Sequence, residues 1–181
     1  MTENSDPNVS GAFIQKARDL LTEEYLPKIE RCVEQLTDEQ VWWRPGEQSN
    51  SIGNLLLHLS GNARQWIVSG LGGATDERRR QTEFDERRII DRDELLGILR
   101  TTLADVDTVL ANFDPSHLLD SYPIQGSKST ALQAIFHVTE HFSMHTGQII
   151  LLTKMLTKTD LAFYDFSTGK SVHTWHDAKP R

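Results

Sequence analysis

The fold of this chain is decided by a stretch of the sequence that reads His137-Val138-Thr139-Glu140-His141-Phe142-Ser143-Met144-His145-Thr146-Gly147-Gln148. It belongs to a longer run, residues 130–156, that is rich in apolar residues and contains no proline and a single glycine. Such a run predicts a helix. At about 100° per residue, the three histidines and Gln148 fall within roughly one quarter of the helix circumference, at the edge of its buried stripe.

Histidines in this position suggest a metal site. Burying an imidazole costs free energy unless something pairs with it, and neutral imidazole is a common metal ligand. Two histidines one turn apart can share one ion, whereas His137 and His145 are roughly 12 Å apart along the axis at about 1.5 Å per residue. The residues alone leave two ligand pairs open, His137 with His141 and His141 with His145. A further ligand must come from another helix. The alternative to a metal site is an ordinary helix whose core and surface histidines are satisfied by other partners.

Residues 137–141 also match the pattern H-x-x-E-H of inverted zinc peptidases. That pattern needs a third protein ligand, usually an acidic residue well downstream. After His145 the chain offers only Asp160, Asp165 and Asp177. We therefore do not favour a peptidase. Glu140 is adjacent to His141, about 100° round the helix, so it is expected to point away from a site built on His141.

The length, charge and cysteine content of the chain exclude several classes of partner and of site. The 181 residues suffice for one compact domain, and the formal net charge of −7 argues against nucleic acid or an anionic membrane surface as the main partner. Cys32 is the only cysteine, which excludes an intrachain disulfide and a cysteine-based metal cluster. Neither a signal peptide nor an apolar run long enough to span a bilayer is present. We expect a cytoplasmic protein.

Three further helices precede the histidine-rich one. The first begins after Ser10 and carries an apolar stripe to Leu36, with a kink at Pro27. Cys32 lies on that stripe and is interpreted as a core residue rather than a nucleophile. The second helix starts at the cap Asn50-Ser51 and ends near Leu71, and the third covers residues 92–113. His58 and Asn62 lie on the edge of the second helix's apolar face, as the histidines do on the last helix.

Four long helices without a convincing strand predict an all-α, antiparallel four-helix bundle. The links between the second, third and fourth helices are long enough to be crossover connections. Residues 70–90 are polar and are interpreted as a solvated loop; the alternative is an active-site flap whose arginines meet an anionic substrate. We expect one domain over residues 1–181, with residues 1–10 flexible and the tail, residues 157–181, packed on the bundle.

Over about residues 12–157 the chain resembles the DinB-like (DinB/YfiT-like, damage-inducible) metalloenzymes, a family that includes the bacillithiol transferase and the mycothiol-dependent maleylpyruvate isomerase. In that family the first metal-binding histidine stands in a setting like Asn54-Leu55-Leu56-Leu57-His58-Leu59, with a tryptophan further on, here Trp66. The other two are separated by three residues and followed by Gly-Gln, to which residues 141–148 are similar. Thr146 departs from the pattern, because an arginine is frequent there.

The resemblance implies a four-helix bundle in which three histidines hold one divalent ion. The implied ligands are His58, His141 and His145. Second-shell or pocket positions then fall to Asn62, His137 and Gln148. Three imidazoles do not identify the metal, so zinc, nickel, iron and manganese all fit.

The implied function is that of a metal-dependent transferase or hydrolase acting on a small molecule, with a low-molecular-weight thiol as cosubstrate. The alternative is a non-catalytic bundle that binds metal or serves as a structural or interaction module. We also expect a homodimer, because the family often dimerises and because Trp42, Trp43 and residues 163–166 add apolar area beyond what four helices need.

Overall fold

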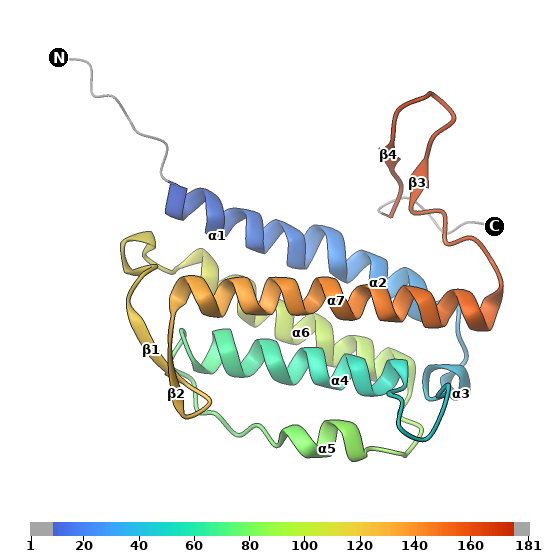
Figure 1. Ribbon diagram of the computed structural model, residues 1–181, viewed down its shortest axis with the longest axis horizontal. Helices are drawn as coiled ribbons and strands as arrows, with labels where there is room; N and C mark the ends of the chain where they lie inside the picture. The colour runs from blue at the N-terminus through green and yellow to red at the C-terminus, as the bar shows by residue number, and fades with distance from the viewer. Residues whose placement is uncertain (1–8, 176–181) are drawn as a thin grey trace.

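A computed structural model describes residues 9–175, and helices dominate it (Figure 1). The segments that build the long helices are α1 (Val9–Asp19), η1 (Leu20–Tyr25), α2 (Leu26–Val33), α4 (Ile52–Ala63), η2 (Arg64–Ser69), α6 (Arg92–Ala111) and α7 (Ala131–Thr157). The shorter elements are α3 (Asp38–Val41), α5 (Arg80–Asp85), η3 (Pro115–His117), β1 (Ser121–Ile124), β2 (Ser127–Thr130), β3 (Tyr164–Asp165) and β4 (Val172–His173). Because η1 and η2 are π-helical continuations of their neighbours, these segments form four long helices, and the predicted all-α fold is confirmed.

The two helices that carry the histidines, α4 and α7, each begin at an N-cap residue whose side chain bonds the first turn. Ser51 caps α4: its hydroxyl accepts from the backbone N–H of Asn54, whose side chain accepts in return from the backbone N–H of Ser51. Thr130 and Gln133 form the same reciprocal pair at the start of α7. These bonds satisfy N–H groups that lack partners within the first helical turn, and so they fix where each helix begins.

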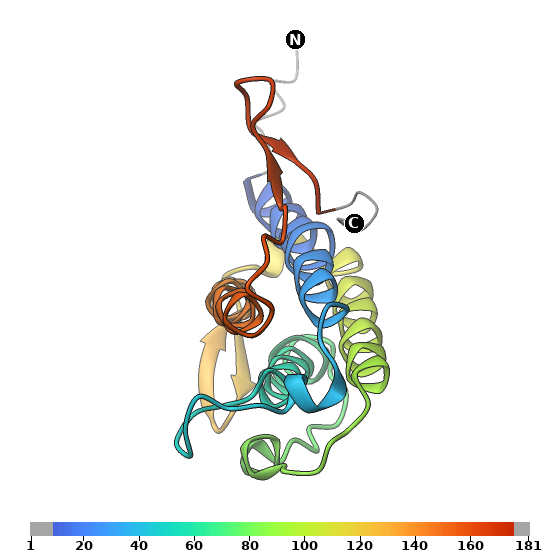
Figure 2. The same ribbon diagram turned by 90° about the vertical axis from the view of Figure 1, so that its right-hand side faces the viewer.

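The four helices pack around one core as two parallel pairs that run antiparallel to each other (Figures 1 and 2). The first helix runs parallel to α7, and α4 runs parallel to α6. Two ion pairs join the first helix to α6, one between Arg18 and Asp107 and one between Glu30 and Arg100. The order of these residues shows that the first helix and α6 run in opposite directions. Since α4 and α6 are parallel, residues 70–91 must travel the length of the bundle, and this link is a crossover as predicted. The second predicted crossover is wrong, because α6 ends and α7 begins at the same end of the bundle (Figure 1).

The first helix continues through Pro27, which lies in the first turn of α2. Proline has no N–H with which to bond the carbonyl of Glu23, four residues earlier. The indole Nε1 of Trp175 donates to that carbonyl at 2.9 Å. Trp175 is buried, as are Leu161 and Phe163 of the same tail. The tail therefore covers part of the first helix.

Two short hairpins depart from the sequence prediction. No convincing strand is predicted from the sequence, yet residues 121–130 form the antiparallel pair β1–β2, whose turn has positive φ at Gln125 and Gly126. In the tail, β3 pairs with β4. The described residues do not include 1–8 and 176–181. Parts of the expected flexible start and of the expected packed tail therefore lie outside the described residues. Within residues 9–175, no helix is both long enough and apolar enough to cross a membrane.

Candidate metal centre

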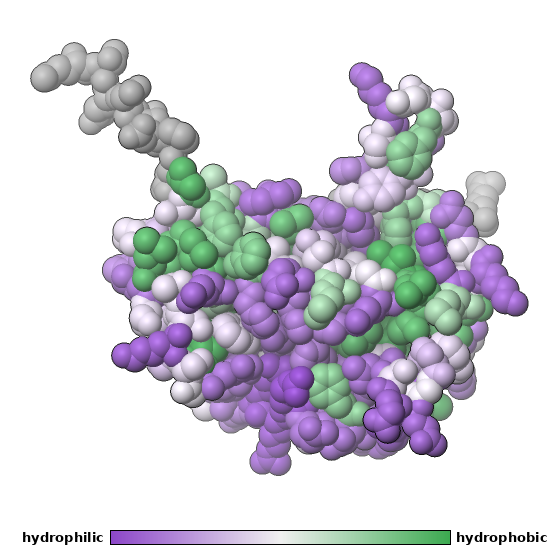
Figure 3. Space-filling view, in the orientation of Figure 1, coloured by the Kyte–Doolittle hydropathy of each residue, from purple (hydrophilic) through white to green (hydrophobic). Residues whose placement is uncertain are grey.

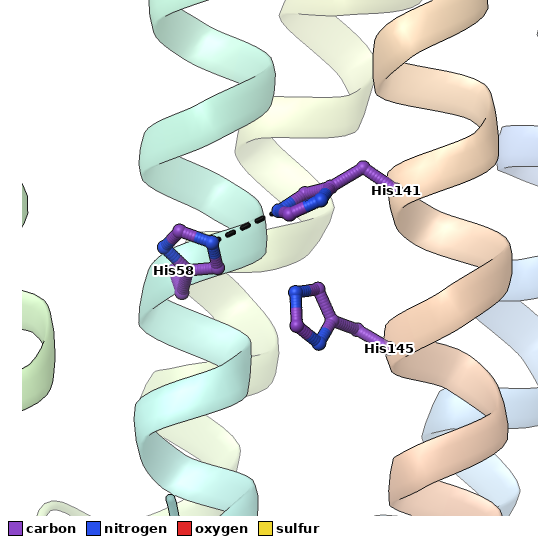
Figure 4. A group of neighbouring side chains, drawn as sticks. All are labelled: His58, His141 and His145. Carbon is purple, nitrogen blue, oxygen red and sulfur yellow. Dashed lines mark hydrogen bonds between the residues drawn. The ribbon is translucent and has the colours of Figure 1, made fainter.

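Three histidines from two antiparallel helices meet in the bundle (Figure 4). His58 lies on α4, and His141 and His145 lie one turn apart on α7. One ring nitrogen of each lies within 4.8 Å of those of the others. The Nε2 atoms of His58 and His141 are 2.9 Å apart. The structure thus brings together His141 and His145, one of the two pairs that the spacing left open, with His58 from another helix.

The site is largely removed from water. His58 is 4 % exposed and His145 is 8 % exposed. Burial, together with the neighbouring His145 and His58, whose positive forms would repel its own, lowers the pKa of His141 to about 3. Burial also lowers the pKa of His145, although its hydrogen bond to Gln148 acts in the opposite direction. His141 and His145 are therefore neutral at neutral pH, with lone pairs available for a cation.

Hydrogen bonds select the nitrogen that each buried ring presents. His145 Nδ1 donates to Gln148 Oε1 at 2.7 Å. His58 Nδ1 donates to Glu83 Oε2 at 2.8 Å. With a proton on Nδ1, each ring carries its lone pair on Nε2. Gln148, which was predicted to lie next to the metal ligands, thus orients the ring of His145.

The other two predicted pocket residues lie beside the site rather than in it. Asn62 Nδ2 donates to His137 Nε2 at 3.2 Å, and the ring of His137 stacks on His141 with centroids 5.3 Å apart. His137 is outside the histidine group, so the H-x-x-E-H pair is not the one assembled. Glu140 lies 3.7 Å from His137 Nδ1 with a side chain that is 55 % exposed, and it does not face the group.

The donor set fits a divalent metal. His145 Nε2 is buried and has no hydrogen-bond partner among residues 9–175. An orphaned imidazole nitrogen in such a position is costly unless a ligand satisfies it. Zinc–nitrogen bonds are about 2.0–2.1 Å long, and one ring nitrogen from each of the three histidines lies within 4.8 Å of the others, close enough for one ion to be shared. Thr146, which stands where the DinB-like pattern often has arginine, is 3 % exposed, and its hydroxyl also lacks a partner in this part of the chain.

Glu83 and Arg78 are residues of the site that sequence reasoning missed. Residues 70–90 were predicted to be a solvated loop, yet they include the helix α5 and place Glu83 against His58. The available signal was Phe84, the one apolar residue among the charged residues 76–88. Its ring centroid lies 4.6 Å from that of His58. One apolar residue in such a segment is typical of a face that packs on the protein.

Arg78 of this connection and Arg64 of η2 are engaged with protein carboxylates. Arg78 Nε donates to Glu83 Oε1 at 2.7 Å, and its guanidinium also donates to Gln65. A cavity of about 400 Å³ lies next to this pair, lined in part by Gly61, Arg78 and Glu83. Arg64, another lining residue, pairs with Asp105 at 3.0 Å. Arg64 and Arg78 therefore do not offer the unpaired charges that the flap alternative requires.

Comparison with known proteins agrees with the fold. The sequence model of the family described as "Protein of unknown function (DUF1572)" matches residues 8–170. Among proteins of curated function, no match was found.

Solved structures with the same fold come from several bacteria. A DinB-like protein from Bacillus cereus superposes with a TM-score of 0.61 at 16% identity, covering 80% of this chain and 90% of that one. A DinB-like protein from Bacillus subtilis gives 0.58 at 17% identity, covering 87% and 97%. A conserved protein from Enterococcus faecalis gives 0.59 at 14% identity, covering 83% and 96%. The fold of the chain is therefore DinB-like.

Proposed function

The chain belongs to the DUF1572 family of proteins of unknown function, and we propose that it is a metal-dependent transferase or hydrolase that acts on a small molecule. In this proposal His58, His141 and His145 hold one divalent ion. The donor set is compatible with zinc, nickel, iron or manganese.

One observation carries the proposal: the Nε2 atom of His145 is buried without a partner among residues 9–175, beside the close pair of His58 and His141 nitrogens. Three protein ligands with further positions left open are the layout of catalytic rather than structural zinc sites. The histidine group contains no fourth residue within the described part of the chain, which supports an open site.

The metal would lower the pKa of a bound thiol or water and so supply a nucleophile near neutral pH. The chain's own residues prepare the site for this. Gln148 holds His145 in the tautomer that presents Nε2, and the burial of both α7 histidines keeps them unprotonated. Asn62 and His137 lie beside the group and are candidates for contacts with a substrate.

A low-molecular-weight thiol is the proposed cosubstrate. The resemblance of residues 54–59 and 141–148 to the pattern of the DinB-like family, which includes thiol-dependent transferases, is what suggests this cosubstrate. The chain's own thiol does not compete for the role, because Cys32 is buried and burial raises its pKa to about 12. A nucleophilic sulfur would therefore have to come from outside the protein.

The test is a thiol-conjugation assay with zinc-, nickel-, iron- or manganese-loaded protein. Cysteine, glutathione, coenzyme A and bacillithiol are each mixed with chlorodinitrobenzene, and the coloured conjugate is followed. We expect at least one thiol to react faster with the wild type than with a His141→Ala variant. His117→Ala, which removes an exposed histidine paired with Asp120, serves as the matched control. If the protein binds metal but none of these rates exceeds that of His141→Ala, the thiol transferase is wrong, and the hydrolase and the non-catalytic bundle are the two functions left.

A further inference from the structure

Glu83 is a buried carboxylate next to the histidine group, although it is not part of that group. It lies on α5 and is 8 % exposed. Its Oε2 accepts from His58 Nδ1 at 2.8 Å and from Arg78 Nη2 at 2.9 Å, and its Oε1 accepts from Arg78 Nε at 2.7 Å. Arg78 and His58 thus engage both oxygens of this carboxylate.

The backbone around Glu83 is fastened to the helix that carries His58. Asn54, one turn before His58 on α4, is fully buried. Its Nδ2 donates to the carbonyl of Glu83 at 2.8 Å and to that of Glu86 at 3.2 Å. Both the main chain and the side chain of Glu83 are thus fixed relative to His58.

Gly61 makes the close approach of Glu83 to α4 possible. A Cβ at this position would lie 2.1 Å from Glu83 Oε1, 2.9 Å from its Cδ and 3.1 Å from Arg78 Nε. Any larger residue would have to displace the carboxylate or the guanidinium. Glycine is the poorest helix former apart from proline, so its presence inside α4 is explained by this contact.

We propose that Glu83, held by Arg78 and Asn54 and admitted by Gly61, is the residue that positions His58 as a metal ligand. This inference rests on the proposed metal site. A carboxylate that accepts from Nδ1 fixes the ring orientation and leaves the lone pair on Nε2, and it makes that nitrogen a stronger donor to a cation. Its negative charge also balances Arg78, which would otherwise repel a divalent ion at the site.

The experiment measures zinc affinity by competition with a chromophoric chelator. Glu83→Gln removes the negative charge. Gly61→Ala displaces the carboxylate of Glu83 without removing any polar group from the protein. We expect both variants to bind zinc about 10–100-fold more weakly than the wild type. Asp85→Asn and Gly97→Ala are the matched controls and should bind as the wild type does. Asp85 is on the same helix and bonds only to Gln81 among the described contacts, and a Cβ at Gly97 meets nothing within 4 Å.

A second readout separates positioning from general structural support. In metal-free protein, long-range ¹H–¹⁵N correlation spectra report which nitrogen of His58 carries the proton. We expect Nδ1–H in the wild type and a mixture of tautomers in Glu83→Gln and Gly61→Ala, with thermal melting confirming that both variants fold.

The inference is overturned if the two variants keep wild-type zinc affinity, or if affinity falls while the His58 tautomer stays unchanged. A wild type that binds no zinc or other transition metal contradicts the proposed metal site instead. In that case the tautomer of His58 in the metal-free variants still decides whether Glu83 orients this ring.

Discussion

Cys32 illustrates how the environment of a single residue decides its chemistry. It is fully buried on the stripe of the first helix, and burial raises the pKa of its thiol to about 12 because the thiolate would lose its hydration. We predict that the native protein at pH 8 reacts with Ellman's reagent far more slowly than the protein unfolded in guanidinium chloride. The absorbance released over time measures this, with Cys32→Ser as the blank. Complete labelling of the folded protein within minutes would mean that the thiol is accessible and reactive.

The residues of the candidate site differ in how well the sequence could identify them. His141 and His145 follow from helical spacing together with the DinB-like pattern. His58 lies on the edge of a second helix's apolar face, and the resemblance to the DinB-like family is what assigned it as the third ligand. The contact of Glu83 with His58 could not be predicted this way, because it joins residues 25 positions apart across an irregular connection. No periodicity specifies such a contact, and its physical basis, the missing side chain of Gly61, becomes clear only in three dimensions.

At the scale of elements, the sequence predicts helices with strong caps and clear apolar stripes. A cap at Asn50-Ser51 and a helix from about residue 130 were predicted. The structure shows the caps to be Ser51 and Thr130, where a hydroxyl and a side-chain amide satisfy the first turn of each helix. The β1–β2 hairpin was missed, because its residues Ser121–Thr130 lack the alternating apolar pattern of a half-buried strand. Helix α5 was missed for a related reason: all but one of its residues are polar or charged, and its position depends on bonds to Asn54 and His58 rather than on an apolar stripe.

At the scale of the whole molecule, the apolar residues that motivated a dimer are partly covered and partly exposed. Trp42 and Phe163 are buried in their own chain, and Trp42 packs against Gly53, whereas Trp43, Tyr164 and Phe166 are exposed. The large exposed apolar residues on α7 are Phe136, Met144, Leu151 and Met155. Figure 3 shows hydrophobic surface over both halves of α7, with a hydrophilic band between them. Exposed apolar area of this kind is typical of a contact surface.

The homodimer therefore remains a prediction, with α7 as the expected contact. Light scattering at micromolar concentration should give a mass near twice the 20.6 kDa of one chain. Leu151→Glu places a charge on a residue that is 59 % exposed, so it should shift the mass toward that of one chain without unfolding the core. A wild-type mass of 20.6 kDa that does not rise with concentration excludes the dimer.

The central claim of this account is that His58, His141 and His145 bind one divalent metal ion. The most direct test is elemental analysis of protein purified without an affinity tag and equilibrated with zinc, nickel, iron or manganese, followed by removal of free metal. We predict about one equivalent of metal per chain in the wild type and essentially none in the triple variant His58→Ala, His141→Ala, His145→Ala, because the variant removes the three imidazole donors. Less than about a tenth of an equivalent of any of these metals in the wild type, or equal metal content in the triple variant, would contradict the claim.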